Sequence, residues 1–94
     1  MIKIKLLPRV GNFAENKDIA RDLRIKELIP LLDKNEDIVL DFKGIDGVTQ
    51  SFIHALISDL IRKYGSVVLE SIFFKNCNEN IKKIISIVVD YMQE

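Results

Sequence analysis

Three stretches of the chain have the hydrophobic patterns of β-strands. In residues 2–6, isoleucine and leucine alternate with lysine, and this period of two predicts a strand with one buried and one solvated face. Residues 38–42 form a short apolar run with β-branched members, which is typical of a central parallel strand. Residues 71–74 predict a third, buried strand, whereas residues 66–69 fit either a short strand or a helical turn.

Between and after these strands, apolar positions repeat at spacings of three and four, which predicts amphipathic helices. The first helix is expected to begin after an N-cap at Asp18 and to kink or break at Pro30, which lacks an N–H donor. Phe13, in the loop before this helix, is expected to anchor the loop on the core. The second helix runs from about Gln50 to Lys63 and ends at Gly65. The third helix has one apolar face, which consists of Ile81, Ile84, Ile85, Val88 and Met92.

The order of these elements is strand, helix, strand, helix, strand, helix. Connections of this length between strands imply right-handed parallel crossovers, with helices covering the sheet. We therefore predict an α/β fold in which residues 1–94 form a single domain, with a small, mainly parallel sheet covered by about three helices.

Composition narrows the function classes. The chain has 94 residues, 48% of them hydrophobic, which is enough for one core without a metal or disulfide. Its 14 basic and 14 acidic residues give no net field to hold nucleic acid or anionic lipid. One cysteine, Cys77, and one histidine, His54, cannot enclose a zinc ion. No signal peptide or membrane-spanning run is evident, so we expect a cytoplasmic protein with no nucleic-acid, membrane, metal or cofactor partner.

The most informative position is Ser51, which a glycine-bearing loop places at the start of the second helix. In one interpretation its hydroxyl caps the helix, an interaction that contributes about 1 kcal/mol. In the other, the free N–H groups and the positive end of the helix dipole form an anion site that would stabilise a phosphate on the hydroxyl. The residues alone favour the cap and leave the switch open.

Catalytic interpretations of the neighbouring residues are weaker. His54 follows Ser51 by one helical turn, but no third group orients the imidazole and no oxyanion donors are evident. Asp41 is expected to accept hydrogen bonds from local donors. Cys77 is expected to be a half-buried turn residue, and the alternative is a thiol whose pKa is lowered by the nearby helix start. Gly44 and Gly47 are not followed by the Gly-Lys-Ser/Thr of a phosphate loop. We therefore expect no enzymatic activity.

The segment from Leu40 to Leu56 resembles the central motif of STAS domains, the anti-sigma factor antagonist fold. The match consists of Leu40-Asp41-Phe42 and Gly44-Ile45, followed by a turn with hydroxyl side chains that opens a helix. The segments 48–52 (Val-Thr-Gln-Ser-Phe) and 74–76 (Phe-Lys-Asn) resemble more closely a short bacterial and archaeal STAS-like family of undescribed function.

In the antagonists, the usual motif continues with Asp-Ser-Ser-Gly-Leu, and a kinase-like anti-sigma ATPase phosphorylates the second serine, with which Ser51 aligns. Thr49, Gln50 and Phe52 stand where that motif has aspartate, serine and glycine. The resemblance implies a non-enzymatic regulatory module in signal transduction. It would bind a protein partner, a histidine-kinase-like ATPase, through Thr49, Gln50, Ser51, Phe52 and His54, with Ser51 as the phosphorylation site.

The alternative is a constitutive, self-associating structural domain in which Ser51 is only a helix cap. It is suggested by Ile87 and Tyr91, which widen the apolar arc of the last helix beyond what one sheet face normally covers. These two residues would then form a homodimer interface. The competing prediction is that the chain itself covers them, through the loop with Phe13 or the segment around Leu31 and Leu32.

Overall fold

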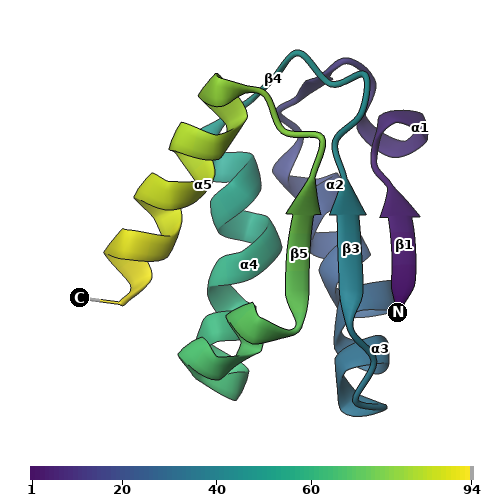
Figure 1. Ribbon diagram of the computed structural model, residues 1–94, viewed down its shortest axis with the longest axis vertical. Coiled ribbons are helices and arrows are strands. Elements are labelled where there is room, and N and C mark those ends of the chain that lie inside the picture. Colours follow the sequence, from purple (N-terminus) through teal and green to yellow (C-terminus); the bar gives the residue numbers. More distant parts are fainter. Residues whose placement is uncertain (94) are drawn as a thin grey trace.

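A three-stranded parallel sheet lies against one layer of helices in a computed structural model that describes residues 1–93 (Figure 1). The strands are β1 (Ile2–Lys5), β3 (Ile38–Asp41) and β5 (Ile72–Lys75), in the order β1-β3-β5. A separate pair of two-residue strands, β2 (Phe13–Ala14) and β4 (Gly47–Val48), is also parallel. The predicted α/β class and the three predicted strands are confirmed.

The helices follow the predicted order, with two short additions. The single turn α1 (Leu7–Val10) follows β1, and the 3₁₀ helix η2 (Ser66–Glu70) occupies the segment that fitted either a strand or a helical turn. The long helices are α4 (Gln50–Tyr64) and α5 (Glu79–Met92). The first predicted helix consists of α2 (Lys17–Leu23), the π-helical segment η1 (Arg24–Leu28) and α3 (Ile29–Asp33).

Two expectations about this first helical segment were wrong. Its N-cap is Asn16 and not Asp18, because the Asn16 side chain accepts hydrogen bonds from the N–H groups of Asp18 and Ile19. The chain also does not break at Pro30, since helical geometry continues to Asp33. The irregularity lies one turn earlier, in the π-helical segment, where the Ile29 N–H bonds to the Arg24 carbonyl.

All long helices cover the same face of the sheet, because both crossovers are right-handed and advance in the same direction from β1 to β3 to β5 (Figure 1). The inner face of the sheet and the apolar face of α4 form the core, and Leu40, Phe52 and Ile53 are among its fully buried members. The predicted apolar face of α5 is confirmed, with Ile81, Ile85 and Val88 buried.

Several hydrophobic residues of the chain are exposed, two of them in segments that were expected to be buried. Phe13 is 47% exposed and Ala14 is the buried member of β2, so the anchor prediction was wrong. Phe73 is 40% exposed because β5 is an edge strand. The prediction that the third strand is buried is therefore only partly correct. Ile87 is 40% and Tyr91 64% exposed, so neither proposed segment of the chain covers them.

None of the helices in residues 1–93 combines the length and apolar character that a membrane crossing requires.

Candidate functional site

Asp41, the last residue of β3, fixes the loop that leads to α4. Its Oδ1 accepts hydrogen bonds from the Lys43 N–H at 3.0 Å and from Asn76 Nδ2 at 2.7 Å, and its Oδ2 lies 3.3 Å from Lys3 Nζ. These donors, the Asn76 amide first, lower the pKa of Asp41 from 3.8 to about 2. The buried carboxylate at the end of β3 therefore contacts the residue that follows β5 and, through the Lys3 side chain, β1. Its bond from the Lys43 N–H agrees with the expectation of local donors.

The loop between β3 and α4 is held on both sides. Gly44 adopts a positive φ of 85°, and a Cβ there would lie 2.7 Å from a methyl group of Leu7. On the other side, the Asp46 N–H donates to the Asn12 carbonyl at 2.7 Å, and Asn78 Nδ2 donates to the Asp46 carbonyl at 2.7 Å. The start of α4 is thus attached to the α1–β2 turn and to the start of α5.

Thr49, and not Ser51, caps α4. Thr49 is extended (φ −94°, ψ 156°), and its Oγ1 accepts a hydrogen bond from the Phe52 N–H at 3.1 Å. Ser51 lies in the first turn with an exposed side chain, and its Oγ is 3.2 Å from Thr49 Oγ1. The interpretation of Ser51 as the cap was wrong, and its hydroxyl is accessible to solvent.

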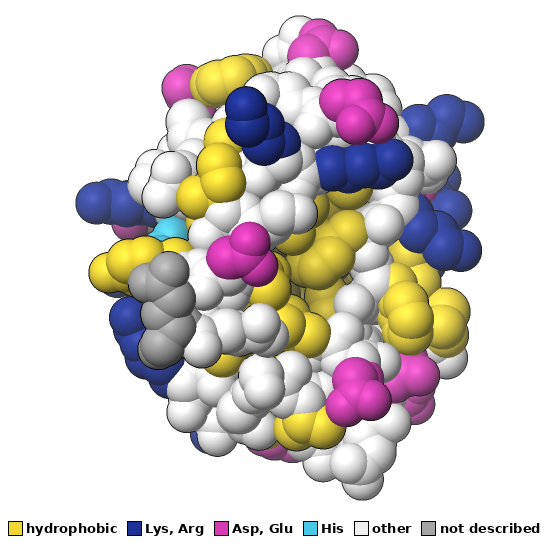
Figure 2. All heavy atoms as spheres, turned by 60° about the vertical axis from the view of Figure 1, so that its left-hand side comes forward, with side chains coloured by type: hydrophobic (Ala, Val, Ile, Leu, Met, Phe, Trp, Pro, Cys, Tyr) yellow, Lys and Arg dark blue, Asp and Glu magenta, His cyan; other side chains and the backbone are white. Residues whose placement is uncertain are grey.

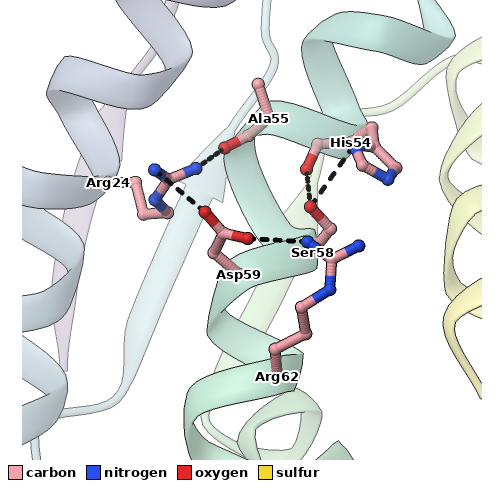
Figure 3. A network of polar contacts seen from close by, with 6 residues as sticks. All are labelled: Arg24, His54, Ala55, Ser58, Asp59 and Arg62. Atoms are coloured by element: carbon pink, nitrogen blue, oxygen red, sulfur yellow. Dashed lines mark hydrogen bonds and ion pairs between the residues drawn. The ribbon is translucent and has the colours of Figure 1, made fainter.

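The His54 imidazole lies beside Ser58, one turn further along α4. Its Nδ1 is 3.4 Å from Ser58 Oγ, and the Ser58 hydroxyl also donates to the His54 carbonyl at 2.5 Å (Figure 3). This serine is buried and the imidazole is half-buried. The pair is a local helical contact, four residues apart, in which the serine bonds back to the preceding turn.

A polar groove runs between α2 and α4 beside these residues. One hollow of about 350 Å³ adjoins a second of about 510 Å³, and the two share Lys17, His54 and Ala55. Ser51 and Lys17 both line the second hollow. The first hollow is lined by four cationic side chains and two acidic ones, namely Lys17, Arg21, Arg24, Arg62, Asp18 and Asp59.

Arg24 forms the floor of this groove. Its side chain is 10% exposed, its Nη1 donates to the Ala55 carbonyl at 2.5 Å, and its Nη2 lies 3.2 Å from Asp59 Oδ2 (Figure 3). The other oxygen of Asp59 is 2.8 Å from Arg62 Nη1. One carboxylate therefore serves two guanidinium groups, and the groove keeps an excess of positive charge in a chain whose total charge is balanced.

Sequence reasoning missed this groove. Lys17, Arg21 and Arg24 recur at spacings of four and three, which places basic side chains on one face of the first helix, and this was an available indication. That this face lies beside Ser51 follows from the packing of α2 on α4, which the sequence does not encode locally.

The remaining candidate residues do not form a second site. Burial raises the pKa of the Cys77 thiol, contrary to the lowered value considered from sequence. Within residues 1–93, no cluster of three or more histidine, cysteine or acidic side chains is placed to hold a metal ion.

A scan against protein-family models matches residues 20–82 to the family described as the STAS-like domain of unknown function (DUF4325). The chain belongs to this STAS-like family. The matched part of the STAS-like domain extends from α2 through the first residues of α5, and so contains Thr49, Ser51, His54 and most of the groove. No curated protein and no solved structure gave a match to the chain.

Proposed function

We propose that this STAS-like domain is a non-enzymatic regulatory module that binds a protein partner through the start of α4 and is switched by phosphorylation of Ser51. The partner class that the STAS resemblance implies is a histidine-kinase-like ATPase, which would also modify the serine. The observation that carries the proposal is that Ser51 is exposed in the first turn of α4 while Thr49 performs the capping. The Ser51 hydroxyl therefore does not cap the helix, and its only hydrogen-bond contact within residues 1–93 is with Thr49 Oγ1, so it is available for another role.

The surroundings of Ser51 suit a phosphate. The N–H groups of Gln50 and Ser51 belong to the first turn and have no carbonyl partner within the helix. Lys17 lines the same hollow as Ser51, and no carboxylate within residues 1–93 pairs with its amine. A phosphate at this position adds a charge of about −1.5 to −2 beside a helix N-terminus and a lysine, which are the groups that stabilise it.

The proposed contact surface is narrower than the sequence predicted. Phe52 is fully buried, so its side chain anchors the first turn in the core and cannot touch a partner. Gln50 and Ser51 are exposed, whereas Thr49 and His54 are half-buried. These four residues remain the proposed partner-binding set, and the charge added to Ser51 would alter this surface directly.

The test compares three forms of the protein in its native host: the unaltered chain, Ser51→Ala and Ser51→Asp. We expect a kinase-like ATPase to copurify with the first two forms and to be lost with the third, and phosphopeptide mapping to locate phosphate on Ser51. A matched control is Ser86→Asp, which adds the same charge to an exposed position on α5. Equal recovery of partners by the alanine and aspartate forms, at equal stability, would reject the switch.

The non-enzymatic part of the proposal has its own test. We expect the purified protein to hydrolyse neither esters, phosphoesters nor nucleotides. Turnover that is reproducible and is abolished by Ser51→Ala or His54→Ala would assign the protein to a different class.

Self-association is the second candidate function, and the exposure of Ile87 and Tyr91 on α5 favours it. Burial of an isoleucine side chain is worth roughly 1.5–3 kcal/mol, so a second copy that covered this edge would gain stability. This homodimer would not require modification of Ser51, and the two candidate functions are separable by experiment.

A further inference from the structure

The helix layer of the domain is wider than its sheet. Helices α2, α4 and α5 pack side by side, whereas the sheet has three strands. Neighbouring strands are about 4.8 Å apart and packed helices about 8–10 Å, so three strands cannot cover three helices. Figure 1 shows the result: α4 and α5 extend past the edge strand β5. Beside β5, the sheet side of these helices therefore lacks a strand to cover it.

This uncovered region is apolar. Figure 2 shows a hollow in which hydrophobic side chains are exposed, on the face that carries α5 and β5. The elements that border the region contribute hydrophobic side chains that contact the core but remain partly exposed, namely Leu69, Phe74, Cys77, Val89 and Met92. At the opposite edge of the sheet, Ile4 of β1 is buried and Ile2 is 38% exposed. The hollow beside β1 is lined by charged side chains as well as apolar ones, namely Lys3, Lys5, Arg9 and Glu27.

The backbone of β5 is also open on this side. The Ser71 carbonyl accepts a hydrogen bond from the N–H of Ile38, the first residue of β3, and the Lys75 carbonyl accepts one from the N–H of Phe42, which follows β3. Because backbone groups alternate in direction along a strand, the intervening Ile72 and Phe74 point their N–H and C=O groups away from β3. The edge of β5 thus offers unpaired donors and acceptors directly beside an apolar hollow.

The two edges of the sheet differ in protection. The β1 edge carries Lys3 and Lys5, and charged residues of this kind prevent strand pairing. The β5 edge carries Phe73 and Phe74 in its middle and a single lysine, Lys75, at its end. The β5 edge is therefore the less protected of the two.

We propose that β5 is a docking edge for an extended segment of a partner protein, which adds a fourth strand to the sheet. Every second side chain of that segment would be apolar and would fill the hollow over α4 and α5. The others would lie on the bare face of the sheet beside Phe73 and Lys75, where acidic side chains are favoured because Lys3, Lys5 and Lys75 outnumber Asp41 there.

A second copy of the chain does not fit this edge. Helices α4 and α5 project past β5 in the helix layer (Figure 1). A twofold-related copy that paired through its own β5 would bring its α4 and α5 into the space that the first copy's helices already occupy. An extended segment brings no helix layer with it, so it can enter where a second copy cannot.

The experiment uses the full chain and a synthetic nine-residue peptide that alternates valine and glutamate. Hydrogen exchange of the Ile72 and Phe74 amides, followed by NMR, reports directly on the edge. We expect saturable binding that slows exchange of both amides by about tenfold or more, because strand pairing gives each amide a partner. A peptide of the same composition with its valines gathered at one end should bind about tenfold more weakly, because it cannot place apolar groups on one face.

N-methylated peptides test the pairing itself on the unaltered protein. Methylation of alternate residues should abolish binding for one set of positions and leave it intact for the other, since only one edge of the added strand faces β5. Equal effects of both sets, unchanged exchange at Ile72 and Phe74 at saturation, or shifts confined to the groove beside Ser51 would each overturn the proposal. So would concentration-dependent protection of the two amides in the free protein, which would indicate a second copy.

Two variants of α5 test whether the peptide binds at the apolar hollow. Val89→Glu places a charge among the partly exposed hydrophobic side chains and should weaken binding by about tenfold or more. Ser86→Glu adds the same charge to the exposed side of α5 and should have no effect. Circular dichroism confirms that both fold, and a loss of affinity that is equal in the two variants would contradict the location. Binding at β5 does not depend on Ser51, so its failure would leave the proposed switch untouched.

Discussion

Replacement of Thr49 by alanine tests which hydroxyl begins α4. The Thr49 side chain accepts the Phe52 N–H at 3.1 Å, whereas no backbone N–H within residues 1–93 donates to the Ser51 hydroxyl. Loss of a threonine N-cap costs about 0.5–2 kcal/mol. Because Phe52 and Ile53 are fully buried, the first turn cannot fray without exposing the core, so we expect about 1–2 kcal/mol here.

The matched variants separate the two positions. Ser51→Ala should change the free energy of unfolding by less than about 0.5 kcal/mol, because an exposed side chain makes no capping bond. Thr49→Ser keeps the hydroxyl and should therefore keep most of the stability that Thr49→Ala loses. Equilibrium urea unfolding followed by circular dichroism measures all three. In thermal unfolding, a loss of 1 kcal/mol corresponds to about 4–8 °C for a domain of this size.

Two outcomes would refute this reasoning. If Ser51→Ala lost as much stability as Thr49→Ala, Ser51 would share the cap and its hydroxyl would not be free for modification. If Thr49→Ser lost as much as Thr49→Ala, the methyl group and not the hydroxyl of Thr49 would stabilise the start of α4.

Three further predictions concern the loop, the sheet and α5. Asp41 has its pKa lowered from 3.8 to about 2, so its contribution to stability is complete above the unfolded pKa and is lost as the pH falls through 2. In urea unfolding, the free energy of unfolding of the unaltered chain should therefore fall more steeply over that pH range than that of Asp41→Asn. Gly44→Ala should destabilise by about 1–2 kcal/mol, because φ is positive and the new Cβ would meet Leu7, and an unchanged urea midpoint would contradict the loop geometry. Sedimentation of the unaltered chain should show a dimer that Ile87→Glu with Tyr91→Glu converts to a folded monomer, whereas monomers in both cases with the variant unfolded would make this edge part of the core.

The elements that were predicted well from the sequence are those whose local pattern fits only one kind of secondary structure. The apolar run at 38–42 is too short for a helix, and it forms the central strand with all of β3 buried. The apolar spacing from Phe52 to Tyr64 fits a helix alone, and Gly65 ends it with a positive φ of 81°. Both predictions depend on residues within a few positions of one another, so no knowledge of packing was required.

The errors arise where neighbouring residues have similar chemistry. Asn16 and Asp18 are equally good caps by type, as are Thr49 and Ser51, and the backbone conformation selects the first of each pair. Phe13 was expected to be buried because it is large. In the two-residue strand β2, the smaller Ala14 points inward instead, and the exposed Phe13 packs beside Gly47.

The groove beside Ser51 required information that no short segment contains. Its cations come from α2, from the π-helical segment and from the end of α4, and they meet only after the helices have packed. The family resemblance located Ser51 from the motif alone, but the neighbouring charges of Lys17 and Arg24 follow from tertiary structure.

The strand order β1-β3-β5 has a consequence for how the chain folds during synthesis. Strand order equals chain order, so no late strand has to insert between two earlier ones. Each strand and helix that leaves the ribosome can join the growing edge of what is already there, which keeps the contacts that must form at each step close in sequence. The exposed edge therefore moves along the nascent chain from β1 to β3 to β5. A nascent chain paused before residue 72 should accordingly expose the β3 edge, and the segment that protects it is the next one to be translated.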